Sequence, residues 1–242
     1  MLRRCFDLLF PPTCVLCGLP DDQASLCTRC RDVLPCNDCA CRRCAAPLDT
    51  PSPGADCGAC QSNPPAYHSA SAPFLYAFPL DAALKRLKFQ RRLLFAPVFA
   101  DLLLPALNHA FPHCDALVPV PLHRRRHVLR GFNQADEICR PLARASGLPT
   151  IMNVLRRRAT RPQSGLTAVE RRRNLRNAFA VHGDFPGRYP LIVDDVLTTG
   201  STCNELARAL LGAGAEQVSV LVVARASTSA SGQAGSGVST NV

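Results

Sequence analysis

Two adjacent acids near the C-terminus are followed by a run of small polar residues. The chain reads LIVDDVLTTGST over residues 191–202, so Asp194 and Asp195 directly follow an apolar run. Gly200 can adopt a positive φ and turn backbone N–H groups inward. Backbone N–H groups and hydroxyls at the start of a helix bind phosphate, while carboxylates accept hydrogen bonds from sugar hydroxyls. The stretch therefore predicts a site for a sugar phosphate.

Two other interpretations of residues 191–202 are a common nucleotide-binding loop and a helix cap. The Walker A pattern GxxxxGK[ST] and the dinucleotide pattern GxGxxG are both absent from the sequence, which argues against the common nucleotide-binding loops. A more ordinary alternative is an aspartate that only caps a helix. Two consecutive acids followed by TTGST favour the sugar-phosphate site over the cap.

The elements around the motif must place it at one edge of a sheet. YPLIV (189–193) predicts a short strand buried on both faces, and a helix is expected from about residue 201 to 211. The segment QVSVLVVA (217–224) then predicts a second strand. Strand, loop, helix and strand form a βαβ unit with a right-handed parallel crossover. In such sheets ligands bind beyond the carboxyl ends of the strands, where Asp194 and Asp195 stand.

Further elements of the same layers are expected upstream. DALVPVP (115–121) is a candidate strand that ends in prolines and therefore opens into a loop. The stretch 133–147 has apolar residues at helical spacing, with Gly147 as its stop. Residues 81–107 predict one or two helices packed on the sheet. We expect an α/β domain over 67–225, with a parallel sheet flanked by helices.

Eleven of the fourteen cysteines lie in residues 1–66. Their CxxC pairs give two sets of four thiolates, namely Cys14, Cys17, Cys27 and Cys30, and Cys41, Cys44, Cys57 and Cys60. Two CxxC knuckles complete a tetrahedral Zn²⁺ site with no open position, so the metal has a structural role. CNDCACRRC adds Cys36 and Cys39, so the number of zinc ions, one or two, and the pairing of the knuckles stay open.

The motifs together resemble a known family. LIVDDVLTTGST resembles, along its full length, the phosphoribosyl pyrophosphate (PRPP) motif of type I phosphoribosyltransferases. RGFNQA (130–135), VPVPL (118–122) and the paired CxxC motifs make the chain similar to the ComF/GntX family over about residues 5–225. The resemblance implies a type I phosphoribosyltransferase-like parallel sheet flanked by helices, with a small N-terminal zinc-ribbon module.

The same resemblance implies roles for individual residues. Asp194 and Asp195 are expected to bind the ribose hydroxyls, and residues 198–202 to wrap the 5′-phosphate. The implied PRPP-binding residues are Val193, Asp194, Asp195, Val196, Leu197, Thr198, Thr199, Gly200, Ser201, Thr202, Arg130 and Gly131. Asp194, Asp195 and Arg130 are the implied catalytic residues.

Two details refine the resemblance. The family pattern favours Cys41 and Cys44 as zinc ligands and leaves Cys36 and Cys39 as spares. Thr198 stands where the enzymes that salvage 6-oxopurines place an aspartate as general base. The acceptor of the phosphoribosyl group therefore stays open.

PRPP chemistry displaces pyrophosphate from C1 of the ribose, so the charge that grows on the leaving group must be neutralised. Mg²⁺ bound with PRPP, arginines and backbone N–H groups can all do this. The stretch VPLHRRRHVLRGFNQ (120–134) is the candidate pyrophosphate loop. Arg130 can fork onto phosphate oxygens and Gly131 lets the backbone approach. A solvated basic run is an equal alternative for 124–126.

Other candidate residues are weaker. Residues 155–181 resemble the flexible hood that closes over PRPP in this fold, with a surface helix as the competing interpretation. His123 and His127 lie four residues apart but among arginines that repel a cation, so a metal site is not expected. Cys203 is expected to pack in the core, with a reactive thiol of lowered pKa as the alternative.

The formal charge is +10, and 26 of the 28 basic residues are arginine. Arginine grips phosphate bidentately, so an anionic partner is expected, although a high-GC genome gives the same bias. The aromatic share is only 6% with no tryptophan, which argues against sequence-specific base readout. The resemblance to the ComF/GntX family implies a link to DNA uptake, so single-stranded DNA, bound through its backbone, and the DNA-uptake machinery are candidate partners beside PRPP.

Three function hypotheses follow. In the first, the protein transfers phosphoribosyl from PRPP to an unidentified acceptor, in DNA uptake (competence) or DNA utilisation. In the second, a non-catalytic protein binds single-stranded DNA and senses PRPP as a ligand. The third, a PRPP-sensing transcription regulator, ranks last because no helix-turn-helix is evident in the sequence.

The expected organisation is a double zinc ribbon over 1–66, the phosphoribosyltransferase-like domain over 67–225 and a disordered small-polar tail over 226–242. The most apolar window, 93–107, contains an aspartate and two prolines and is too short to span a bilayer. We expect a cytoplasmic protein without membrane insertion, where thiols serve metal binding and not disulfides. The oligomeric state is not predicted.

Overall fold

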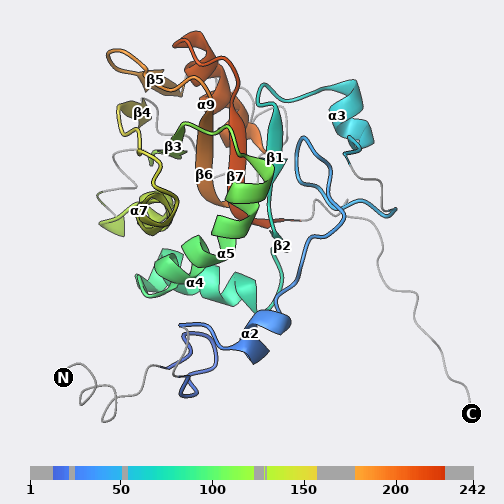
Figure 1. The fold of residues 1–242 in the computed structure, drawn as a ribbon, viewed down its shortest axis with the longest axis vertical. Coiled ribbons are helices and arrows are strands. Elements are labelled where there is room, and N and C mark those ends of the chain that lie inside the picture. Colours follow the sequence, from blue (N-terminus) through green and yellow to red (C-terminus); the bar gives the residue numbers. More distant parts are fainter. Residues whose placement is uncertain are drawn as a thin grey trace, which may run out of the picture.

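The structure is a computed structural model that describes residues 13–21, 25–50, 54–122, 128, 130–156 and 178–226. In chain order its elements are α2 (Thr28–Asp32), α3 (Gly58–Ser62), β1 (Ser69–Ser71), β2 (Phe74–Leu75), α4 (Leu80–Gln90), α5 (Phe95–Ala110), β3 (Ala116–Pro119), α7 (Gln134–Ser146), β4 (Val154–Arg156), β5 (Phe179–Val181), β6 (Pro190–Leu197), α9 (Ser201–Gly212) and β7 (Ser219–Arg225). Figure 1 shows the sheet at the centre, with α4, α5 and α7 beside it.

The main sheet has the order β1-β7-β6-β3, and β2 also pairs with β7. Every strand pair in it is parallel. Strands β4 and β5 form a separate antiparallel pair. The predicted α/β fold with a parallel sheet is confirmed, and the β6–α9–β7 unit is present as the sequence pattern indicates.

Both faces of the sheet are covered, which is why its strands read as continuous apolar runs. Alternate side chains divide between two cores, because successive residues of a strand point to opposite faces. One core, formed with α4, α5 and α7, contains Leu117, Leu191, Val193, Leu221 and Val223. The other, formed with α9, contains Val118, Ile192, Val220 and Val222.

The helices follow the sequence pattern closely. The segment 81–107 forms two helices, α4 and α5, separated at Arg91, which adopts a left-handed conformation with φ 53°. Helix α7 begins after Asn133, whose side chain accepts a hydrogen bond from the Ala135 N–H, and ends at Gly147 with φ 74°. In the part of the chain that the structure describes, no helix is long and apolar enough to cross a bilayer.

Strand β6 differs from the expectation. The sequence predicts a strand over 189–193 that ends before the two acids, but β6 continues to Leu197. The extension exists because β7 supplies hydrogen-bonding partners, with Val196 opposite Ala224 and Leu197 opposite Arg225. The two aspartates therefore lie within the strand, where their backbone is held by the sheet.

The expected hood over 155–181 is described only at its two ends. Strand β4 and strand β5 pair with each other there, with Val154 opposite Val181. Residues 157–177 lie outside the described residues, as do His123, His127 and 227–242 of the proposed tail.

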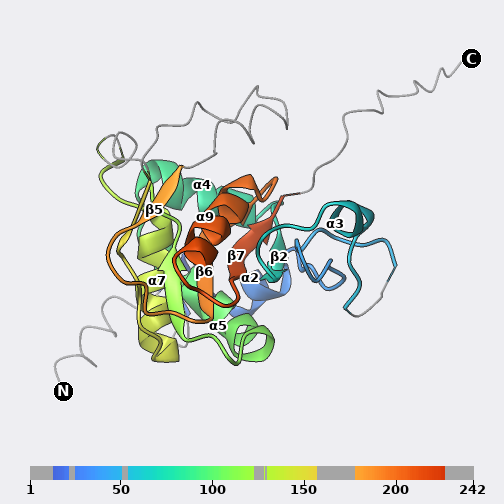
Figure 2. The same ribbon diagram turned by 90° about the horizontal axis from the view of Figure 1, so that it is seen from above.

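The cysteine-rich segment packs against the α/β domain at two separate places. Its first half, with α2, lies next to α4, and its second half, with α3, lies beyond the β1 edge of the sheet (Figure 1, Figure 2). Leu26 and Leu34 of the first half are buried in the core of α4 and α5. Ala45 and Tyr67 of the second half are buried in the core of α9. The two halves thus brace opposite cores of one domain.

Candidate functional site

The carboxyl end of β3 lies beside the middle of β6. Pro119 is opposite Val193, and the Val120 N–H donates to the Val193 carbonyl at 2.9 Å. Beyond this point β3 leaves the sheet while β6 continues along β7. A cavity of about 300 Å³ opens there, and its wall includes Tyr76, Lys88, Val120, Leu122, Arg130, Asn133, Gln134, Arg156, the stretch 194–203 and Ala226.

Asp194 and Asp195 line this cavity with different partners. The Asp195 carboxylate accepts from the Val196 N–H at 3.0 Å and from the Lys88 ammonium at 3.3 Å, and the residue is 4% exposed. The Asp194 carboxylate accepts from the Asp195 N–H at 2.9 Å. Lys88 on α4 is therefore the cation that offsets the paired negative charges.

Burial raises the pKa of Asp194 well above its usual value, and the adjacent Asp195 charge raises it further. Lys88 and the Asp195 N–H act in the opposite direction. A desolvated pair of acids gains from any ligand that donates hydrogen bonds or brings positive charge. Two sugar hydroxyls are donors of this kind.

The turn after β6 forms the second wall. Gly200 has φ 72° and is the N-cap of α9, and the first helical hydrogen bond runs from the Asn204 N–H to the Gly200 carbonyl at 2.8 Å. The Thr199 and Ser201 hydroxyls lie 3.0 Å apart. The first N–H groups of a helix have no partner within the helix, and the helix dipole adds positive charge there. The turn can thus receive a phosphate.

Arg130 also lines the cavity. Its guanidinium lies 3.4 Å from the Gln134 side-chain oxygen and 5.7 Å from the ring of Phe89. The Asn133 side chain ties this wall to the sheet, because it donates to the Val120 carbonyl at 3.0 Å and also caps α7. Arg130 therefore lies near the carboxyl end of β3 and lines the same cavity as the two aspartates.

The structure brings together most of the residues that the sequence singles out. Arg130 and all residues from 194 to 202 line the cavity. Val193 is fully buried in the sheet, and Gly131 lies behind the wall, next to the Arg91 guanidinium. Cys203 is 2% exposed, and burial raises its pKa, so its predicted packing role holds and the reactive thiol does not.

Sequence reasoning missed other residues of the cavity. Tyr76 and Lys88 lie outside every predicted motif, whereas Asn133 and Gln134 fall in the candidate pyrophosphate loop and Arg156 in the expected hood, without a role of their own. Lys88 carried a usable signal, because it is one of only two lysines in an arginine-rich chain. The others are ordinary residues of helices, strands and turns, and only the packing of those elements places them here.

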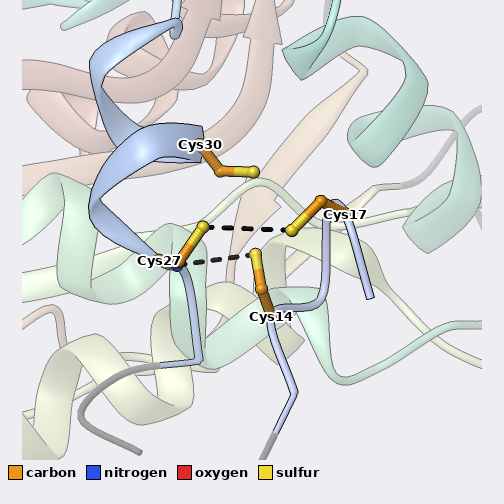
Figure 3. Close-up of side chains that lie close together, drawn as sticks. All are labelled: Cys14, Cys17, Cys27 and Cys30. Atoms are coloured by element: carbon orange, nitrogen blue, oxygen red, sulfur yellow. Dashed lines mark hydrogen bonds between the residues drawn. The ribbon is translucent and has the colours of Figure 1, made fainter. Parts of the chain in front are cut away.

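The eight predicted zinc ligands form two separate groups. Cys14, Cys17, Cys27 and Cys30 form one group, and Cys41, Cys44, Cys57 and Cys60 form the other, with the sulfurs of each group all within 4.8 Å of one another. Figure 3 shows the first four side chains converging on a common centre. The pairing is sequential, and the structure supports two sites. Cys36 and Cys39 belong to neither group, as the family pattern implies.

The sulfur spacing fits zinc. A tetrahedron with Zn–S bonds of about 2.3 Å has sulfurs about 3.8 Å apart. The Cys17 and Cys27 sulfurs are 3.9 Å apart, and those of Cys44 and Cys57 are 3.6 Å apart. Each set holds four thiols and no other ligand type, so the residues fit structural Zn²⁺.

Each of the two sites contains one cysteine whose backbone contacts favour the thiolate. Burial opposes ionisation of Cys14, but backbone N–H groups, including that of Cys27 at 3.4 Å, lower its pKa to about 6. Burial likewise opposes ionisation of Cys41, and backbone N–H groups, including that of Cys57 at 3.2 Å, lower its pKa to about 7. The backbone thus prepares one ligand of each site for metal.

Comparison with known proteins agrees with both parts of the molecule. A family described as a double zinc ribbon domain matches residues 5–61, and one described as a phosphoribosyl transferase domain matches residues 130–233. The DNA utilization protein YhgH of Salmonella typhi is 38% identical over 226 residues, covering 90% of this chain and 99% of the relative. Competence protein F of Haemophilus influenzae is 37% identical over 179 residues, covering 70% of this chain and 78% of the relative.

A solved structure of orotate phosphoribosyltransferase from Aeropyrum pernix is also similar, with 23% identity over 52% of this chain and 56% of that chain, and a TM-score of 0.32. The fold and the sites define a phosphoribosyltransferase-type α/β domain preceded by a double zinc ribbon. The chain belongs to the ComF/GntX family, with the DNA utilization and competence proteins named above. The family resemblance read from the motifs is confirmed.

Proposed function

We propose that this protein binds PRPP together with Mg²⁺ and transfers the phosphoribosyl group to an acceptor during DNA uptake or DNA utilisation. One observation carries the proposal. The paired acids of β6, the turn before α9 and Arg130 line a single cavity, and each wall fits a different part of PRPP. The names of the relatives support the link to DNA.

Each wall has a chemical task under this proposal. Asp194 and Asp195 accept hydrogen bonds from the ribose hydroxyls and so fix the ring. The turn over 198–202 donates N–H and hydroxyl groups to the 5′-phosphate. Arg130, in the same cavity, neutralises charge on the pyrophosphate as its bond to C1 breaks. This stabilisation grows as negative charge develops on the pyrophosphate. It therefore lowers the free energy of the transition state more than that of bound PRPP, which lowers the barrier.

The cavity suits a magnesium–PRPP complex. Its acidic donors are carboxylate oxygens, which is the chemistry that Mg²⁺ accepts, and the ion keeps several ligands from phosphate and water. Asp194 and Asp195 would hold the complex through the ribose hydroxyls and water, and the metal would add positive charge beside the pyrophosphate. The raised pKa of Asp194, which burial causes first and the Asp195 charge second, fits a site in which an added cation would stabilise the ionised pair.

The experiment is a search for pyrophosphate release. Zinc-loaded protein is incubated with Mg²⁺ and PRPP, and with nucleobases, amines or single-stranded DNA as acceptors. We expect release above the rate without protein for one acceptor class, and loss of release in Arg130→Ala. Background release with every acceptor would refute the catalytic proposal.

A second candidate function has its own observation. Phe89 is 68% exposed, and the guanidinium of Arg130, a residue of the cavity wall, lies over its ring at 5.7 Å. An exposed aromatic ring beside basic residues is the arrangement that stacks the bases of a single strand. In this function the protein binds single-stranded DNA without turnover and PRPP is a sensed ligand.

A salt titration of single-strand binding separates the two candidates. Binding through the DNA backbone should weaken steeply as salt rises. We expect Phe89→Ala to weaken binding about tenfold, because base stacking contributes on the order of 1–3 kcal/mol. Phe78→Ala is the control, since Phe78 is 80% exposed beyond the other end of α4. Equal effects of the two changes, or a flat salt response, would refute this candidate.

A further inference from the structure

A buried arginine joins the second zinc site to the phosphate turn. Arg225, the last residue of β7, is 6% exposed. Its Nε donates to the Cys44 carbonyl at 2.9 Å, and its Nη1 donates to the Leu197 carbonyl at 2.8 Å. Nη1 also donates to the Thr198 carbonyl. One guanidinium therefore spans from a zinc-ligand residue to the backbone of the turn.

The bond to Thr198 bears directly on phosphate binding. In a trans peptide the carbonyl of one residue and the N–H of the next point in opposite directions. When Arg225 holds the Thr198 carbonyl, the Thr199 N–H is turned away from Arg225, and both threonines line the cavity. A planar guanidinium is suited to this task because its donors have a fixed geometry.

Two more contacts join the same zinc segment to the turn. The Ala66 N–H donates to the Asn204 side-chain oxygen at 2.7 Å, in the first turns of α9. The hydroxyl of Tyr67, which is 2% exposed, lies 2.9 Å from the position that a Cβ on Gly200 would take. Tyr67 thus supports the turn directly beneath its glycine.

The first zinc site is placed differently. Cys14 and Cys30 are buried in the core formed with α4 and α5, and α2 lies at the far end of the molecule from α3 (Figure 1). The described residues therefore hold two cysteine sites of the same composition, of which the second is joined to the phosphate turn through Arg225, Ala66 and Tyr67.

We propose that the zinc ion of the second site positions the phosphate turn through Arg225, so that PRPP affinity depends on that zinc and not on the first. This inference rests on the proposed PRPP site. Four thiolate bonds fix the Cys44 backbone, and the fixed carbonyl holds one end of the guanidinium. Loss of the metal frees this anchor, and the carbonyls of Leu197 and Thr198 then lose a fixed donor. The second ribbon is thus a metal-dependent support of the ligand site.

The test compares Cys60→Ser with Cys30→Ser. The two cysteines are the last ligands of their sites and occupy the same place on α3 and α2. Each variant should retain one zinc by metal analysis. We expect Cys60→Ser to weaken PRPP binding about tenfold or more, because buried hydrogen bonds to a charged group are lost, while Cys30→Ser binds within about twofold of wild type. Equal weakening in both variants would overturn the inference.

Arg225 itself gives a second test that keeps both zinc ions. Arg225→Met should weaken PRPP binding about as much as Cys60→Ser, and Arg225→Lys should recover little because an ammonium cannot span the same carbonyls. The double variant Arg225→Met/Cys60→Ser should be no weaker than either single variant, since both break one connection. Unchanged PRPP affinity in Arg225→Met, or additive losses in the double variant, would overturn the inference.

Hydrogen exchange separates this inference from the proposed function. Exchange at 198–200 is measured without PRPP in wild type, Arg225→Met, Cys60→Ser and Cys30→Ser. We expect faster exchange in Arg225→Met and Cys60→Ser, and exchange at the wild-type rate in Cys30→Ser. If wild type fails to bind PRPP but this exchange pattern holds, the proposed function fails while the support by the second zinc stands. If residues 198–200 exchange at the wild-type rate in Arg225→Met, the inference that Arg225 supports the turn is refuted, whether or not the protein binds PRPP.

Discussion

The ammonium group of Lys88 lies 3.3 Å from the carboxylate of Asp195, although 107 positions separate the two residues in the chain. Lys88 is 30% exposed by its side chain and Asp195 only 6%, so the pair lies at the boundary between cavity and core. The contact joins α4 to the carboxyl half of β6. It gives the paired acids a cation on the side where the cavity opens.

This contact predicts that Lys88→Met weakens PRPP binding. Without the ammonium, the two acids must be held together with no counter-charge, and a hydrogen bond to a charged group contributes about 1.5–3 kcal/mol. We expect affinity to fall about tenfold in a calorimetric titration, with most of it restored in Lys88→Arg. Lys85→Met is the matched control, because Lys85 lies on the same helix but pairs with Asp81. Equal losses in the Lys85 and Lys88 variants would contradict the assignment.

The paired acids that are proposed to bind the ribose should destabilise the folded protein. The pKa of Asp194 is raised in the folded chain, first by burial and then by Asp195. A group whose pKa is higher in the folded than in the unfolded protein stabilises the fold at pH values below its unfolded pKa. This contribution to the free energy of unfolding is lost as the pH rises through the folded pKa. We therefore expect Asp194→Asn to melt about 2–4 °C higher at pH 7, for a gain of about 1 kcal/mol, while PRPP binding is lost.

The gain from Asp194→Asn should shrink as the pH falls toward the unfolded value of about 4. Asp195→Asn is the comparison, because it weakens the ion pair with Lys88 and should bring no such gain. Melting curves by circular dichroism between pH 4 and pH 8 measure both effects. A gain that is constant over this range would contradict the electrostatic explanation.

Gly200 offers a test of the turn. At φ 72° a side chain is strained, and a Cβ would lie 2.9 Å from the Tyr67 hydroxyl. Gly200→Ala should therefore destabilise the protein by about 1–2 kcal/mol and weaken phosphate binding, with partial recovery in Gly200→Ala/Tyr67→Phe. Gly212→Ala is the control, since a Cβ at this last residue of α9 meets nothing within 4 Å. No recovery in the double variant would rule out the hydroxyl contact as the cause.

Zinc content tests the two metal sites. The purified chain should hold two zinc ions by elemental analysis, and Cys17→Ser should hold one. Cys36→Ser/Cys39→Ser should still hold two, because both cysteines lie outside the two groups. A loss of zinc in the Cys36/Cys39 variant would show that the ligand sets are wrong. Chelation should also lower the melting temperature, since each ribbon braces a core of the domain.

The sequence predicts well those parts of the site whose functional residues are close together in the chain. The turn from Thr198 to Thr202 and the CxxC knuckles are contiguous, so residue type and spacing already define their geometry. The extent of β6 was missed because acids are poor strand residues, and only pairing with β7 extends the strand to Leu197. The contacts of Lys88 could not be predicted, because they depend on how α4 packs against the sheet.

Arg225 shows the same limit more sharply. Its sequence context, at the end of VSVLVVAR, indicates a charged residue after a buried strand and nothing more. Its function in the fold depends on the carbonyls of Cys44 and Leu197, which lie 181 and 28 positions away in the chain. Spacing carries no information about partners at such distances, and a single sequence cannot supply it.

The central claim is that the cavity at the end of β6 binds PRPP, and one titration tests it most directly. PRPP with Mg²⁺ is titrated into wild type and into Asp194→Ala/Asp195→Ala, with circular dichroism to show that both are folded. The proposed site predicts saturable binding to wild type and none to the double variant. PRPP binding that survives in the folded double variant, or is absent from folded wild type, would contradict it.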